Sequence, residues 1–142
     1  MTQIDFYFHV ENKLQMACTL SAKACARGMR VHAYCADADT GAKLSRLLWT
    51  AQAVSFIPHC SPSDPLATVT PVIVDHEGTE PAHDEVLINL HPEWPPFFSR
   101  FKRLIEIVSL DEEDRGQARA RFKFYRDRGY AIQNHDLSKS AQ

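Results

Sequence analysis

A run of charged and aromatic residues in the last third of the chain holds the side chains best suited to binding chemistry. Four consecutive acidic residues give way at once to basic residues interleaved with aromatic ones. If the run is helical, its basic residues recur at steps of four, four and three and share one face. These residues are Arg115, Arg119, Lys123 and Arg126, with Phe122 beside them. Such a face suits an anionic ligand that also carries an apolar group.

The order of charges in this run favours a helix. Acidic residues in the first turn and basic residues further along both complement the helix dipole. Ser109 and Glu112 have the spacing of a capping box, which predicts that the helix starts just before the acids. Gly116 in the second turn costs about 1 kcal/mol relative to alanine. A solvated face is the ordinary interpretation of a charge run. The local excess of one sign, and aromatic residues that do not all fit the buried side, argue for a binding face instead.

The elements that must position this run follow from hydrophobic periodicity and breakers. Strands are predicted at 3–9, 30–35, 54–57, 71–74, 86–90 and 104–108. Helices are predicted at 13–27, capped by Asn12 and ended by Gly28, and through 44–49, capped by Asp37 or Asp39. A short helical piece is expected around 97–101, a loop over 59–70, and an irregular tail after Gly129.

Alternating strands and helices predict a single α/β domain over residues 1–142. We expect a three-layer α/β/α arrangement, Rossmann-like, with a mainly parallel sheet covered on both faces. This fold often binds nucleotides, but no glycine lies between the first strand and the helix at 13–27. A phosphate-binding loop needs glycines so that backbone N–H groups can approach the anion. No nucleotide-binding loop and no cofactor are therefore expected.

Catalytic and metal-binding patterns are also missing. The four cysteines contain no Cys-x-x-Cys pair, and the seven histidines lack zinc-finger spacing, so we expect no metal. Asp37, Asp39 and Asp75 are explained as helix caps or turn residues. A His59–Cys60 nucleophile pair is disfavoured because sequence neighbours rarely converge on one point. The sequence predicts a protein that is not an enzyme.

Charge and hydropathy limit the environment and the partners. The net charge is −2, so the basic run is local and general coating of nucleic acid is disfavoured. No apolar run of about eighteen residues and no leader segment are recognised, so we expect a cytoplasmic protein.

A second candidate surface surrounds Trp49 and Phe56, which precede a loop rich in proline. Large aromatic residues beside such a loop can be core or can anchor an interface, and both interpretations remain open.

Three segments together resemble the chi subunit of bacterial DNA polymerase III, a non-catalytic part of the clamp-loader assembly. The segments are Asp5-Phe6-Tyr7-Phe8, Leu47-Leu48-Trp49 with Ser55-Phe56-Ile57-Pro58-His59, and Ala118-Arg119-Ala120-Arg121-Phe122-Lys123-Phe124-Tyr125-Arg126. The resemblance spans most of the chain and implies a three-layer fold without a bound nucleotide.

The resemblance also implies two partners. One is the C-terminal tail of single-stranded DNA-binding protein (SSB), an acidic segment that ends in Pro-Phe. Arg115, Arg119 and Lys123 would neutralise its carboxylates, and Phe122 and Val108 would wall a pocket for its terminal phenylalanine.

The other implied partner is the psi subunit, or a helicase at the same surface. Trp49 and Phe56 match the positions that anchor that contact, whereas Arg121 and Arg128 are expected to be solvated surface. The alternative function is direct binding of single-stranded nucleic acid, with Phe122, Phe124 and Tyr125 as stacking platforms.

Overall fold

The computed structural model of the chain describes residues 1–50 and 57–140. Within them, seven strands form one parallel sheet in the order β3-β4-β2-β5-β6-β1-β7. The strands are β1 (Gln3–Val10), β2 (Val31–Cys35), β3 (His59–Cys60), β4 (Val72–Asp75), β5 (Val86–Leu90), β6 (Arg103–Ser109) and β7 (Ile132–Asp136). The helices are α1 (Lys13–Ala26), α2 (Ala38–Thr50), α3 (Glu112–Asp127) and α4 (Leu137–Ser140), with a 3₁₀ turn η1 (Phe98–Arg100).

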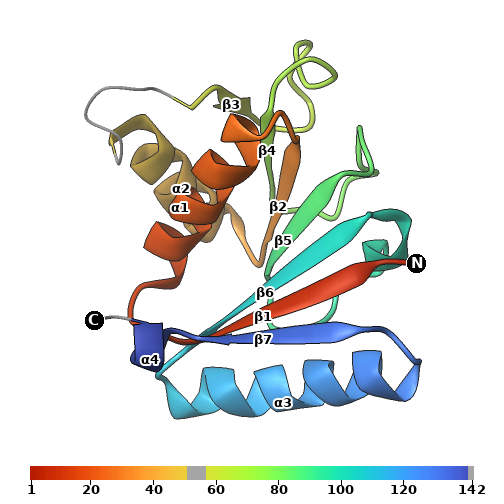
Figure 1. Ribbon diagram of the computed structural model, residues 1–142. Helices are drawn as coiled ribbons and strands as arrows, with labels where there is room; N and C mark the ends of the chain where they lie inside the picture. The colour runs from red at the N-terminus through yellow and green to blue at the C-terminus, as the bar shows by residue number, and fades with distance from the viewer. Residues whose placement is uncertain (51–56, 141–142) are drawn as a thin grey trace.

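Helices cover both faces of the sheet, which confirms the three-layer prediction. Figure 1 shows α1 and α2 on one face and α3 along the other. Because successive side chains on a strand point to opposite faces, β1 sends Phe6 toward α3 and Tyr7 toward α1. In the same way β6 sends Leu104 to the α3 side and Ile105 to the other. Each face therefore has its own apolar core.

Local signals place the first two helices as predicted. Asn12 caps α1, because its Oδ1 accepts the N–H of Gln15 at 3.0 Å. Gly28 follows the end of α1 with φ 76°, a left-handed conformation that glycine adopts without strain. Asp37 caps α2 by accepting the N–H of Thr40 at 2.8 Å. The start of α1 is thus closed by a side chain rather than left open as an anion-binding loop.

The strand order differs from that of dinucleotide-binding domains, in which the first strand lies at the centre of the sheet. Here β1 is next to the edge, between β6 and the edge strand β7. This order brings α3, which follows β6, under the last three strands of the sheet (Figure 1).

Two predictions near the ends of elements need comment. The predicted strand at 54–57 falls mostly outside the described residues; β3 begins at His59, inside the segment predicted as a loop. The prediction of an irregular tail after Gly129 was wrong, because β7 pairs in parallel with β1 over Ile132–Asp136 and α4 follows β7. Gln133 and Asn134 are exposed, so an edge strand with this polarity gives no alternating apolar signal.

Candidate functional site

The start of α3 was predicted with the wrong cap. Asp111 is the capping residue, because its Oδ2 accepts the N–H of Asp114 at 3.0 Å. Ser109 instead ends β6, and its N–H and hydroxyl both donate to Asp114 Oδ2, at 2.8 and 2.9 Å. Pairing with β1 keeps Ser109 in the sheet, and the acid two residues later then takes the capping position.

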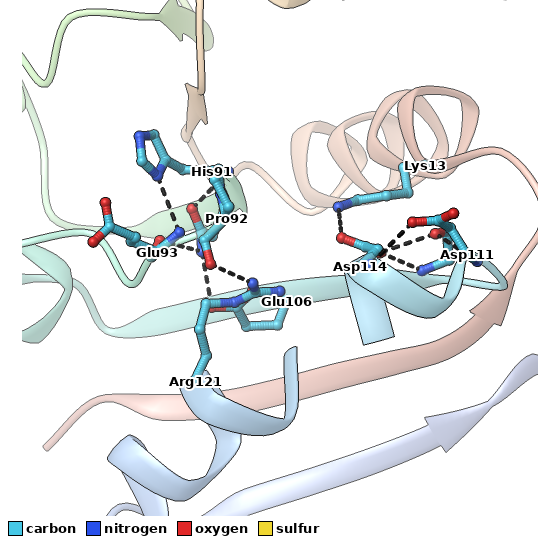
Figure 2. A network of polar contacts seen from close by, with 10 residues as sticks. Lys13, His91, Pro92, Glu93, Glu106, Asp111, Asp114 and Arg121 are labelled. Carbon is cyan, nitrogen blue, oxygen red and sulfur yellow. Dashed lines mark hydrogen bonds and ion pairs between the residues drawn. The ribbon is translucent and has the colours of Figure 1, made fainter. Parts of the chain in front are cut away.

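Lys13 ties this end of α3 to the start of α1. Its Nζ lies 2.9 Å from Asp114 Oδ1 (Figure 2). Burial alone would raise the pKa of Asp114, but the hydrogen bonds from Ser109 and the charge of Lys13 hold that pKa below its ordinary value. The carboxylate therefore stays ionised and fixes the point where the basic face begins.

A buried carboxylate fixes the middle of α3. Glu106 on β6 accepts from Arg121 Nε at 2.9 Å with Oε1. Its Oε2 accepts from the Tyr125 hydroxyl at 2.6 Å and from Asn89 Nδ2 at 2.9 Å. Arg121 is only 1% exposed, so the expectation that it is solvated surface was wrong. An acid inside the apolar strand at 104–108 was the sequence signal that a buried basic partner was needed.

The same network reaches the loop after β5. Arg121 Nη1 donates to the Pro92 carbonyl at 2.7 Å, and Asn89 Nδ2 donates to the Glu93 carbonyl at 3.2 Å. Figure 2 shows this group, with Arg121 rising from α3 toward Pro92 and Glu106. Burial raises the pKa of Glu106, and the Arg121 charge and the three hydrogen bonds oppose that rise. One side of α3 is thus locked to the sheet.

The next side of α3 faces a groove of about 560 Å³ between the helix and the strands β1, β6 and β7. Its apolar floor consists of Phe8, Val108, Ala118 and Phe122. Its rim carries Arg115, Arg119, Lys123 and Arg126. The structure therefore brings together all five residues that the family resemblance assigned to tail binding, and their role in binding stays a prediction. A volume of this size is in the range of sites that hold small ligands or several side chains.

The cations of the rim are exposed and only lightly paired. Glu112 lies 3.5 Å from Arg115 Nη1 and 3.7 Å from Arg119 Nη2. Arg126 lies 3.4 Å from Asp127. In the part of the chain that the structure describes, Lys123 has no carboxylate within ion-pair distance. Exposed pairs of this kind contribute little to stability, so the rim is available to an anion from outside.

Sequence reasoning missed the part of the groove wall that comes from the end of β1 and from β7. Phe8 and His9 come from the end of β1, where the pairing with β6 shifts register between Tyr7 and Val10. His9 has φ 60°, and its Nδ1 lies 2.7 Å from Asp136 Oδ1. Asn134 on β7 closes the far wall. Asn134 was missed because the segment of β7 was expected to be irregular. Phe8 and His9 were missed because the register shift at the end of β1 leaves no pattern in the sequence.

The aromatic residues of α3 do not form a stacking surface. Tyr125 is completely buried and donates to Glu106. Phe124 is stacked on Trp94, with ring centroids 3.6 Å apart, and the Arg128 guanidinium lies 3.6 Å from its centroid. Phe122 packs edge-on against Phe6 and reaches the groove. The prediction of three exposed platforms was therefore wrong for Tyr125, and both other rings are already engaged.

At the end of α2, Trp49 is 64% exposed and meets the His59 ring edge-on, with centroids 6.1 Å apart. Phe56, the other residue of that predicted surface, lies outside the described residues. Trp49 is therefore a surface residue, and its role as an anchor stays a prediction.

The described residues contain no group of three or more histidine, cysteine or acidic side chains placed to hold a metal ion. Burial raises the pKa of Cys18 to about 11. Burial, with Asp75 and Asp37 nearby, raises that of Cys35 to about 12. These thiols are therefore poor nucleophiles at neutral pH. None of the described helices has the length and apolar character needed to cross a membrane.

The fold and the groove together define a parallel α/β domain whose first helix start is closed and whose basic groove lies beside its last long helix. Comparison with known proteins identifies the family of this domain. The family model described as "DNA polymerase III chi subunit, HolC" matches residues 1–133, and the chain belongs to this family.

Three curated relatives carry the name "DNA polymerase III subunit chi". The protein from Pseudomonas aeruginosa is 37% identical over 144 residues, covering 98% of this chain and 99% of the relative. The proteins from Haemophilus influenzae and Escherichia coli are each 27% identical, covering 94% and 92% of this chain and 96% and 88% of the relative. The chain is thus related over nearly its whole length to accessory subunits of a replicative DNA polymerase.

Proposed function

We propose that this chain is a non-catalytic adaptor that links the clamp-loader assembly of DNA polymerase III to SSB. It does so by holding the acidic C-terminal tail of that protein in the groove beside α3. One observation carries the proposal. The five residues that the family resemblance assigned to tail binding line a single groove with an apolar floor and a cationic rim. They are Val108, Arg115, Arg119, Phe122 and Lys123.

The chemistry of the groove fits such a tail. Arginine binds carboxylates through charge-assisted and often paired hydrogen bonds, and Arg115 and Arg119 are adjacent on the rim. The floor at Val108 and Phe122 suits one aromatic side chain, whose burial contributes roughly 2–3 kcal/mol. Once the entropy of association is subtracted, micromolar affinity is expected. Added salt should weaken binding because the rim charges are exposed.

Several features support an adaptor rather than an enzyme. The start of α1 is capped by Asn12, and two of the four cysteine thiols have strongly raised pKa values. The acids Asp37 and Asp75 act as a helix cap and a turn residue, since their carboxylates accept backbone N–H groups. These features agree with a protein that acts through its surfaces, and we propose that it does so in the cytoplasm.

The proposal is tested by titrating the full chain with a fluorescent acidic peptide that ends in Pro-Phe. The matched control is the same composition with the phenylalanine moved to the amino end. We expect micromolar binding of the first peptide, at least tenfold weaker binding of the second, and a clear loss of affinity on raising the salt. Equal binding of the two peptides would show that no site for a terminal aromatic residue exists.

Direct binding of single-stranded nucleic acid is the rival function. It is disfavoured because Tyr125 is buried and Phe124 is covered by Trp94 and Arg128. A titration with an unstructured oligonucleotide at the same salt separates the two. Oligonucleotide binding tighter than peptide binding would favour the rival.

A second surface is proposed to join the chain to the psi subunit, or to a helicase that uses the same position. The exposed Trp49 supports this, since exposed tryptophans are frequent anchors of interfaces. The test is capture of purified psi subunit by the Trp49→Ala variant, with Trp94→Ala as the matched control on α3's side of the sheet. We expect capture to fail only for Trp49→Ala; equal capture by both variants would remove Trp49 from the interface.

A further inference from the structure

One carboxylate of the chain already contacts two cations of the groove rim. Glu112, in the first turn of α3, places Oε2 at 3.5 Å from Arg115 Nη1 and Oε1 at 3.7 Å from Arg119 Nη2. The Glu112 side chain is 79% exposed, and the two arginines are 43% and 66% exposed. A single internal carboxylate thus bridges two of the four cations that line the groove.

The longer of these two contacts passes over Gly116. Arg119 lies seven residues after Glu112, a separation of about 10 Å along the helix axis. Residues 112, 116 and 119 share one strip of the helix surface, so position 116 lies between the other two. A Cβ built at Gly116 would come within 3.6 Å of Arg119 Nη2. The Arg119 guanidinium therefore lies back over the bare glycine toward Glu112.

We propose that Glu112 is an internal competitor for the carboxylate position of the groove, and that it sets how acidic a peptide must be to bind. This inference rests on the proposed function and adds a residue that determines its specificity. An incoming carboxylate at Arg115 and Arg119 replaces the Glu112 carboxylate instead of meeting free cations.

The consequence for ligand choice follows from counting ion pairs. A peptide with one carboxylate exchanges one pair for another at these arginines and gains little there. A peptide with several carboxylates also reaches Lys123 and Arg126, which Glu112 does not contact in the structure. Glu112 therefore weakens the binding of every ligand carboxylate at these arginines, and a tail needs further carboxylates, at Lys123 and Arg126, to bind tightly.

The test compares Glu112→Gln with Glu113→Gln. Both variants remove one negative charge from neighbouring positions of the same turn, but Glu113 borders a different hollow, beside Lys13 and Pro92. Affinity for the acidic peptide ending in Pro-Phe is measured by fluorescence anisotropy. We expect Glu112→Gln to bind about two- to fivefold more tightly than the unaltered chain, the range expected for release of an exposed ion pair. Glu113→Gln should stay within about 1.5-fold.

A second comparison separates local competition from long-range repulsion. The gain from Glu112→Gln should shrink in an Arg119→Gln background, because one of the two contacted cations is then missing. Glu112 is not a competitor if the unaltered chain binds the peptide but Glu112→Gln and Glu113→Gln bind it equally well. The same conclusion follows if the gain in affinity from Glu112→Gln is undiminished in the Arg119→Gln background. No binding by the unaltered chain would instead overturn the proposed function itself.

Discussion

Arg121 of α3 and Glu106 of β6 form an ion pair at 2.9 Å in which the side chains are 2% and 0% exposed. The pair lies on the side of the helix next to the basic groove, so the same element is fixed to the sheet through one side and open to a ligand on another. The order of residues along α3 makes this possible, because Arg121 lies between Arg119 and Lys123 in sequence but on a different helix face.

Removal of Arg121 should destabilise the fold strongly. Arg121→Leu leaves the Glu106 carboxylate buried without its charge partner, a change that typically costs about 3–5 kcal/mol. The control is Arg128→Leu at the C-cap of the same helix, an exposed arginine whose loss should cost no more than about 1 kcal/mol. The free energy of unfolding in urea measures both. Similar small losses for the two variants would mean that the buried pair does not anchor α3.

The cost of Arg121→Leu should also depend on pH. Burial raises the pKa of Glu106, and loss of the arginine raises it further, so folding of the variant favours the protonated acid. A raised pKa in the folded state means stability that is present at low pH and is lost as the pH rises. The difference from the unaltered chain should therefore be smallest in acid and grow toward neutral pH, as long as both remain folded.

Asp114 should contribute stability with the opposite pH dependence. Its pKa is held below the ordinary value, so its contribution is present above the unfolded-state value near 4 and is lost as the pH falls through the folded-state value. Asp114→Asn should cost about 1–2 kcal/mol at pH 7, through the bonds to Ser109 and Lys13, and much less near pH 3. Glu113→Gln is the control, and a pH-independent cost for Asp114→Asn would contradict the assignment.

Two glycines near the ends of α3 should respond oppositely to alanine. Gly116 is helical, and a Cβ there meets only Arg119 Nη2 at an ordinary 3.6 Å, so Gly116→Ala should stabilise by about 1 kcal/mol. Gly129 follows the helix with φ 83°, which strains any residue with a Cβ, so Gly129→Ala should destabilise by about 1 kcal/mol. Thermal unfolding of both variants checks the signs, and stabilisation by both would mean that Gly129 is not held left-handed.

Sequence reasoning found the layers of the fold and the cationic face because both depend on short-range periodicity. Leu104 and Ile105 alternate between the two cores, and Arg115 and Arg119 repeat at the helical step. It misjudged features that depend on distant partners. Arg121 resembles its exposed neighbours in sequence, and only Glu106, fifteen residues earlier, makes it a buried residue.

The walls of the groove were missed for a related reason. β7 is a polar edge strand, so Asn134 carries no apolar signal, and its place is decided by pairing with Phe6 on the first strand of the chain. His9 enters the groove through a local shift in strand register that composition does not encode.

Binding of an acidic peptide in the groove beside α3 is best measured with one pair of charge reversals. Arg119→Glu within α3 and Arg128→Glu at its C-cap change the net charge equally, but only Arg119 lines the groove. Titration calorimetry with the peptide ending in Pro-Phe should show at least a tenfold loss of affinity for Arg119→Glu and less than a twofold change for Arg128→Glu, with both variants folded. Equal effects of the two reversals would contradict the assignment of the groove.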